Sequence, residues 1–150
     1  DLEGMAAERV ANLGSETDLK VIQAIFDKMK VAHDNKNSSE EASLDAQFHM
    51  AIIEASHNVF LLHMVRSMFE MLKKGIFYNR QVMFSRHTTR GTLLEQHRSI
   101  CTAIQKRNAQ GARKAIEDHM DFIKTCMQEV KKAEANEEIA KLRLDHTTTS

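Results

Sequence analysis

The chain has 150 residues with no proline and five glycines, and its 21 basic residues are balanced by 21 acidic ones. A chain of this length fits one domain that buries about two-thirds of its unfolded surface. A formal net charge of zero argues against binding nucleic acid or an anionic membrane surface by this chain alone, because both need clustered positive charge.

The residue usage predicts an all-α fold. Alanine, leucine, methionine, glutamate, lysine and glutamine are plentiful, and all of them favour helices. No apolar run approaches the roughly 18 residues that a membrane span needs, and no signal peptide is visible. Cys101 and Cys126 lack a CxxC spacing, which indicates reduced thiols in a cytoplasmic protein, with a disulfide as the alternative.

The first two expected helices cover residues 2–13 and residues 18–33. The first begins without a cap, as if cut from a longer protein, and Gly14 suits its end. Asp18 is the expected cap of the second. Their predicted inner faces consist of Met5, Ala6, Val10 and Leu13, and of Val21, Ile22, Ile25, Phe26 and Met29.

A third helix is expected over residues 38–55, because Ser38 followed by Glu41 forms a capping box. Its inner face carries Phe48 and Ile52. Asp45 and His49 lie one step round the helix and, being four apart, project from one face. A carboxylate and an imidazole at the edge of a buried face need partners, since burying unpaired polar groups is costly.

Three more elements follow. A fourth helix is expected from residue 59 to about 83 after an Asn58 cap, then a turn over residues 85–89 and a fifth helix over residues 92–107 that buries His97. Asn108 is the expected cap of the sixth helix, which buries His119. The sequence then becomes charged, so we expect residues 1–134 to form a ligand-binding and dimerisation domain and residues 135–150 a charged tail that frays at its end.

The three buried histidines and one aspartate form a candidate metal site. A single histidine on an apolar face is more often a hydrogen-bonded core residue. Here three different helices each place one histidine in the core, and one divalent cation would satisfy His49, His97 and His119 together with Asp45. Further coordination positions would admit water or a small carboxylate. A polar core cluster without an ion is the alternative, and the pattern leaves both open.

Several of these segments carry a resemblance: residues 45–49 (DAQFH), 55–58 (ASHN) and 95–97 (EQH), and the stretch from Ala112 to His119. They resemble the ligand-binding domain, called FCD, of bacterial GntR-type transcriptional regulators of the FadR subgroup. The likeness covers most of the chain, and regulators of L-lactate utilisation and of the pyruvate dehydrogenase complex are the most similar kind.

The resemblance implies an antiparallel bundle of six or seven helices with a central metal and ligand pocket. It implies one divalent metal held by Asp45, His49, His97 and His119, with zinc as the first candidate and nickel, manganese or iron as alternatives. It also implies a small organic acid effector beside the metal, a homodimer, and DNA binding only through an N-terminal winged helix-turn-helix that this chain lacks.

Three side chains of the fourth expected helix are candidates for binding the effector: Arg80, Asn79 and Arg66. An arginine fork pairs naturally with a carboxylate, and an amide can bind a hydroxyl. The alternative places Arg80 in a salt bridge or in solvent, and Arg66 lies further from the inner face.

Three functions compete for this chain. The first is a metal-dependent sensor of a lactate-like or pyruvate-like carboxylate, which controls the DNA affinity of the missing domain. A metal-dependent hydrolase or oxygenase is the second, and a structural interaction module without metal is the third. No spare glutamate or histidine is expected on an inner face near the ligands, which favours a sensor over an enzyme. The metal, the acid, and activation versus repression stay undecided.

Overall fold

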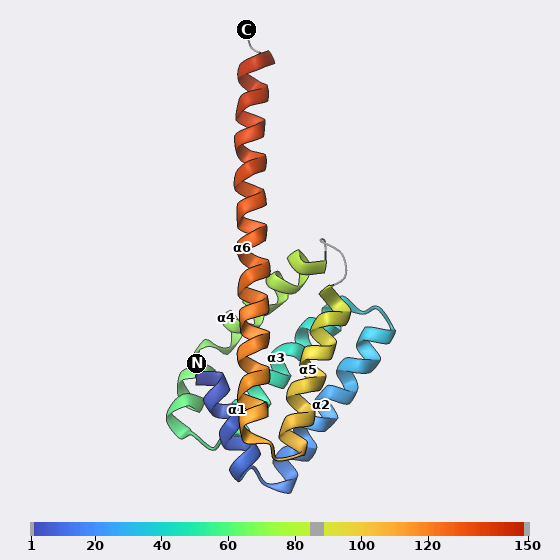
Figure 1. The fold of residues 1–150 in the computed structure, drawn as a ribbon, viewed down its shortest axis with the longest axis vertical. Helices are drawn as coiled ribbons and strands as arrows, with labels where there is room; N and C mark the ends of the chain where they lie inside the picture. The colour runs from blue at the N-terminus through green and yellow to red at the C-terminus, as the bar shows by residue number, and fades with distance from the viewer. Residues whose placement is uncertain (1, 85–88, 149–150) are drawn as a thin grey trace.

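The computed structural model shows an all-α fold, which confirms the fold class expected from composition (Figure 1). The structure describes residues 2–84 and 89–148, apart from the side chains at positions 72, 76, 79–81 and 84. Six helices and no strands occur in these ranges. They are α1 (Leu2–Leu13), α2 (Glu16–Asp34), α3 (Ser38–Ala55), α4 (Val59–Phe84), α5 (Thr89–Gln105) and α6 (Ala109–Thr148).

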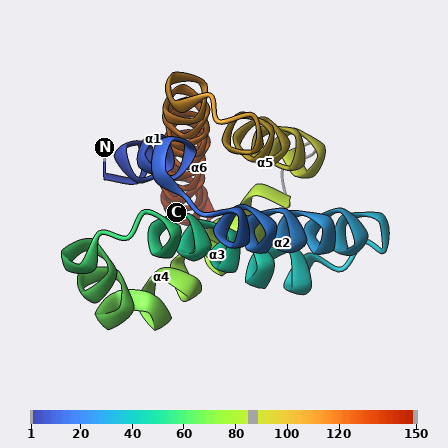
Figure 2. The same cartoon turned by 90° about the horizontal axis from the view of Figure 1, so that it is seen from below.

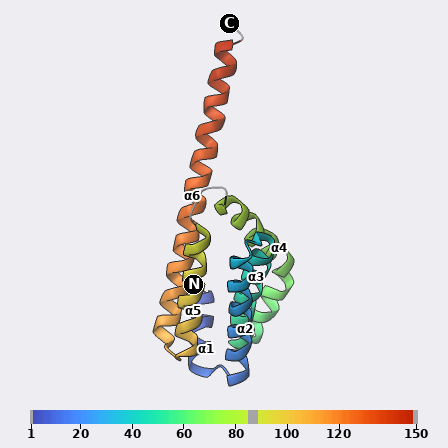
Figure 3. The same ribbon diagram turned by 90° about the vertical axis from the view of Figure 1, so that its right-hand side faces the viewer.

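The helices are arranged in layers, as Figure 2 shows from below and Figure 3 from the side. α1, α6 and α5 lie next to one another in the first layer, and α2 and α3 pack together in the second. α4 covers the outer face of α3. The apolar core fills the space between the two main layers, with Phe48, Ile52, Ile100 and Ile116 fully buried there.

The connections between helices repeat one local structure. Lys36, His57 and Arg107 adopt left-handed backbone conformations with φ of 53°, 53° and 55°, and each is followed by an asparagine. The asparagine side chain accepts a hydrogen bond from the first turn of the next helix, as Asn58 Oδ1 does from the Leu61 backbone at 3.1 Å. A left-handed residue ends one helix and the asparagine begins the next, so each connection stays short.

Two predicted caps are wrong by a few positions. Ser15 caps α2 and Asp18 completes its capping box from the third helical position, rather than being the cap itself. Asn37, not Ser38, caps α3. Ser, Asn and Asp all satisfy free backbone N–H groups, so the sequence alone does not choose between neighbouring candidates.

The predicted inner face of α1 is also wrong in part. Met5 and Leu13 are 55% and 65% exposed, and the buried side consists of small residues, Ala6, Ala7, Val10 and Ala11. These small side chains let α1 pack closely against α6. Val21, expected in the core, is 49% exposed on α2.

The later helices differ from the expectation mainly at their ends. α5 begins at Thr89, earlier than residue 92, and α6 continues to Thr148 rather than fraying before it. The expected turn over residues 85–89 falls mostly outside the described part of the chain. Within the described ranges, no helix combines the length and the apolar character that crossing a bilayer requires.

Candidate metal centre

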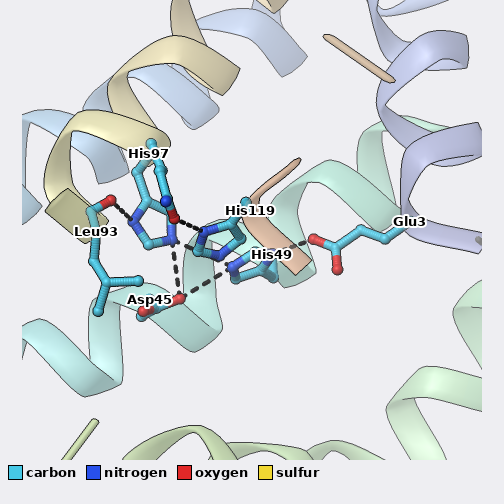
Figure 4. Close-up of polar contacts among 7 residues, drawn as sticks. Glu3, Asp45, His49, Leu93, His97 and His119 are labelled. Atoms are coloured by element: carbon cyan, nitrogen blue, oxygen red, sulfur yellow. Dashed lines mark hydrogen bonds and ion pairs between the residues drawn. The ribbon is translucent and has the colours of Figure 1, made fainter. Parts of the chain in front are cut away.

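Four side chains from three helices meet between the two layers. Asp45 and His49 come from α3, His97 from α5 and His119 from α6, and one ligand atom of each lies within 4.8 Å of the others (Figure 4). All four are buried, and His97 and His119 are fully so. The structure thus brings together the four residues that the sequence singled out.

The local fold explains this convergence. Asp45 and His49 are one helical turn apart on α3, so both reach toward the opposite layer. Phe48, also on α3, packs edge-on against the rings of His49 and His97, with centroid separations of 5.9 Å and 5.4 Å. The aromatic ring closes one side of the cluster and keeps the imidazoles in place.

The Asp45 carboxylate lies at the centre of the polar contacts. Its Oδ1 atom is 3.0 Å from His49 Nε2 and 3.1 Å from His97 Nε2, and these two nitrogens are 3.3 Å apart. The His119 ring stacks on that of His49 and meets that of His97 at centroid distances of 5.3 Å and 4.6 Å. Three imidazoles and a carboxylate oxygen thus surround a single small volume.

The other ring nitrogen of each histidine is held from outside the cluster. His97 Nδ1 donates to the Leu93 backbone oxygen at 2.7 Å, His119 Nδ1 donates to Gln96 Oε1 at 2.8 Å, and His49 Nδ1 donates to the Glu3 carboxylate. Carbonyl, amide and carboxylate oxygens only accept, so each ring carries a hydrogen on Nδ1. The Nε2 atom of each ring is left facing the cluster, where a metal ion would take the place of any hydrogen on it, as at metal-binding histidines.

Charge also favours a cation in this cluster. Burial disfavours a protonated His49, but the charge of Glu3 and the hydrogen bonds to Asp45 and Glu3 outweigh it and raise the pKa of His49 to about 10. A proton on this ring and a metal ion would compete for the same nitrogen. Imidazole and carboxylate donors suit zinc, nickel, manganese or iron, so the residues fit the divalent metal expected from the sequence.

A cavity of about 230 Å³ adjoins the cluster at Asp45 and His49. Nine of the thirteen described residues that line it are apolar. Lys73 on α4 is the one lysine or arginine among the described lining residues, and it forms no ion pair with another described residue. A ligand in this cavity would meet the cluster at one end and mostly hydrocarbon elsewhere.

The residues predicted to bind an effector have different placements. Arg66 is exposed on α4, where it pairs with Glu54 at 3.4 Å, and it does not line the cavity. The side chains of Asn79 and Arg80 lie outside the described residues, so their proposed role stays a prediction. Sequence reasoning missed Lys73, and it missed Glu3 and Gln96, the outer partners of His49 and His119.

The sequence matches a known family over most of its length. The family model described as FCD domain matches residues 1–122. An Escherichia coli (strain K12) protein named for regulation of the L-lactate dehydrogenase operon is 33% identical over 127 residues, which cover 85% of this chain and 48% of that protein. The Glc operon transcriptional activator of the same organism is 30% identical over 132 residues, covering 86% of this chain and 52% of the activator.

A solved structure has a similar fold. Streptococcus agalactiae GntR superposes with a TM-score of 0.65 at 22% identity, over 83% of this chain and 54% of that one. The chain therefore spans about half the length of the proteins it matches.

Proposed function

The chain belongs to the FCD domain family, and from this premise we propose that it senses a small carboxylate through a bound divalent metal ion. The family is regulatory, and the named relatives regulate operons, so the chain is an effector-binding domain of a GntR-family transcriptional regulator and not an enzyme. Binding of the acid would change the DNA affinity of an N-terminal domain outside this sequence, in a cytoplasmic homodimer.

One observation carries the metal part of this proposal. The Nε2 atoms of three buried histidines face one carboxylate oxygen, while every Nδ1 is held by an outer acceptor. A core cluster that needed only hydrogen bonds would not require three ring nitrogens to converge on one carboxylate oxygen. Zinc is the first candidate, because it accepts imidazole and carboxylate ligands readily, and nickel, manganese or iron are alternatives.

The effector part rests on the cavity and on the relatives. The cavity reaches the cluster at Asp45 and His49, so an acid within it could approach the cation directly. A bound cation would supply positions for the acid's oxygens, and Lys73 would add a positive charge on the α4 wall. The relative named for an L-lactate dehydrogenase operon supports a lactate-like or pyruvate-like head group. Asn79, Arg80 and Arg66 remain candidate contacts.

The same geometry suggests how binding would be transmitted. The ligands come from α3 in one layer and from α5 and α6 in the other, so a metal with its acid would set the distance between the layers. An acid that binds one spacing better than another would shift the population of the dimer toward it.

Metal analysis of protein purified without a metal-affinity column tests the proposal. We expect about one equivalent of metal per chain in the native protein and in His63→Ala, which removes an exposed histidine of α4. His97→Ala removes a buried ligand and should lose the metal. Small carboxylates should raise the melting temperature of the metal-loaded protein and not of chelator-treated protein. Equal metal content in His97→Ala and His63→Ala would contradict the metal site.

A further inference from the structure

We infer that the effector is a 2-hydroxy or 2-oxo acid with an apolar side chain of about four to six carbons, larger than the methyl group of lactate or pyruvate. The inference rests on the proposed function for the acid head group at the metal. It goes further by assigning the rest of the cavity to hydrocarbon.

The first support is size. The cavity beside the cluster measures about 230 Å³. An apolar cavity of about 150 Å³ is large enough to hold benzene, which has six carbon atoms. A three-carbon acid with its head group on the metal would therefore leave much of the cavity unfilled, and unfilled space forfeits packing contacts.

The second support is the chemistry of the walls. Among the described lining residues, the polar ones other than Lys73 are Glu3, Asp45 and His49, and these are joined to one another at the cluster. Val65 and Phe69 of α4 and Met120 and Ile123 of α6 also line the cavity. Among these described apolar side chains, a second carboxylate or several hydroxyls would lose water without gaining a hydrogen-bond partner, whereas an alkyl or aryl group gains from leaving water.

The third support is the abundance of methionine in these walls. Met50, Met83 and Met120 all line the cavity, and each comes from a different helix. Methionine is unbranched and adjusts to ligands of differing shape. Lys73 is exposed, which places its charge at the water-facing side rather than among the apolar walls.

The test is a titration of the zinc-loaded protein with a homologous series of acids, followed by calorimetry. The series runs from pyruvate to 2-oxoundecanoate in steps of one carbon, so that the side chains have one to nine carbons, with phenylpyruvate as an aromatic member. Each buried methylene should tighten binding about fourfold, so 2-oxohexanoate should bind about 60-fold more tightly than pyruvate. The matching acids without the 2-oxo group should bind more weakly at every length, because they offer the metal one coordinating oxygen atom fewer.

Three variants locate the side chain of the acid. Phe69→Ala enlarges the cavity and should move the best chain length upward by two or three carbons, as expected from the volume removed. Val65→Leu narrows it and should move the optimum down by about one carbon. Phe60→Ala is the matched control, since Phe60 lies on the same helix, is 78% exposed and does not line the cavity. Its affinities for the series of acids should equal those of the native protein.

The possible outcomes separate the two proposals. Affinity that is highest for pyruvate or lactate and falls with each methylene would overturn the inference, and the carboxylate sensor would stand. An optimum unchanged in both Phe69→Ala and Val65→Leu would also overturn it. Absence of binding by every acid to zinc-loaded protein would overturn the proposed function itself.

Discussion

Each imidazole of the cluster is positioned by an acceptor that is not itself a candidate ligand. Glu3, Gln96 and the Leu93 carbonyl hold the Nδ1 atoms of His49, His119 and His97. Such outer hydrogen bonds fix both the tautomer and the orientation of a metal-binding ring. The geometry of the site therefore depends on these residues as well as on the four ligands.

Replacement of Gln96 tests this dependence. Gln96→Ala removes the acceptor for His119 and should weaken zinc affinity by about 10- to 100-fold, measured by competition with a chelating dye. Gln96→Glu keeps an acceptor and should restore most of the affinity. Gln47→Ala removes an exposed glutamine of α3 and should leave the affinity unchanged. Equal zinc affinity in all three variants would mean that the outer bond does not position the ring.

The sequence could predict the ligands but not their outer partners. Asp45 and His49 share a helix face by spacing, and His97 and His119 fall within apolar stripes, so burial brings all four inward. The Glu3–His49 contact joins residues 46 positions apart, and the Gln96–His119 contact joins residues 23 apart. No pattern within a single helix encodes such pairs, because they depend on how the layers pack.

At the scale of elements, periodicity identified each helix but not always its inner face. The small residues of α1 proved to be the buried ones, because helix packing rewards close approach as well as hydrophobicity. Large side chains such as Met5 and Leu13 then remain outside. Extents were predicted within a few residues for five helices, whereas the end of α6 was not predicted, since its charged stretch resembles a tail.

An ion pair centred on the buried Glu41 joins three helices at one end of the bundle. Glu41 in the first turn of α3 accepts from Arg90 Nε of α5 at 3.0 Å, and lies 3.3 Å from His33 Nδ1 of α2. Arg90 also donates to the His33 backbone oxygen at 2.9 Å. The Glu41 side chain is only 3% exposed, whereas Arg90 and His33 are 28% and 25% exposed, so losing Glu41 would leave two partly buried donors without this acceptor.

We expect Glu41→Ala to lower the free energy of unfolding by about 1–3 kcal/mol, because Arg90 and His33 lose their acceptor but remain partly open to water. Glu40→Ala, at the exposed neighbouring position, should change it by less than about 0.5 kcal/mol. Urea denaturation followed by circular dichroism measures both. Similar losses in the two variants would show that the helix terminus, and not the ion pair, is responsible.

Two glycines, Gly14 and Gly75, differ in how closely other atoms surround them, so substituting each by alanine should affect stability differently. A Cβ atom at Gly14 would lie 2.6 Å from the Val10 backbone oxygen and 3.0 Å from Leu19 Cδ1, where α1 turns into α2. A Cβ atom at Gly75 of α4 meets nothing within 4 Å. Gly14→Ala should therefore destabilise the protein by about 1–3 kcal/mol, whereas Gly75→Ala should stabilise it by about 0.5–1 kcal/mol. Thermal denaturation would show melting temperatures that move in opposite directions, and equal shifts would contradict the packing at Gly14.

At the scale of the whole molecule, α6 is much longer than the bundle it belongs to. Figures 1 and 3 show its C-terminal part projecting away from the other helices. Val130 is the last buried residue of the helix, and the family match ends at residue 122. The expected division between a domain over residues 1–134 and a charged tail over residues 135–150 thus remains a prediction. The structure adds that the described part of this tail is helical.

Removal of residues 135–150 tests that division. None of these positions is buried among the described residues, so we expect the melting temperature to change by less than about 2 °C and the metal content to stay the same. Truncation after residue 125 would remove Val130 as well and should lower the melting temperature clearly. A large loss on removing residues 135–150 alone would place them in the folding unit.

His119 and the far end of α6 belong to one continuous helix, so a tilt of that helix at the cluster would be amplified with distance along it. From His119 to Thr148 the helix measures about 44 Å at 1.5 Å per residue, so a tilt of about 5° at His119 would move the C-terminal end of the helix by about 4 Å. A tilt of a few degrees at the cluster would thus become a displacement of several ångströms at a distance no small acid could span.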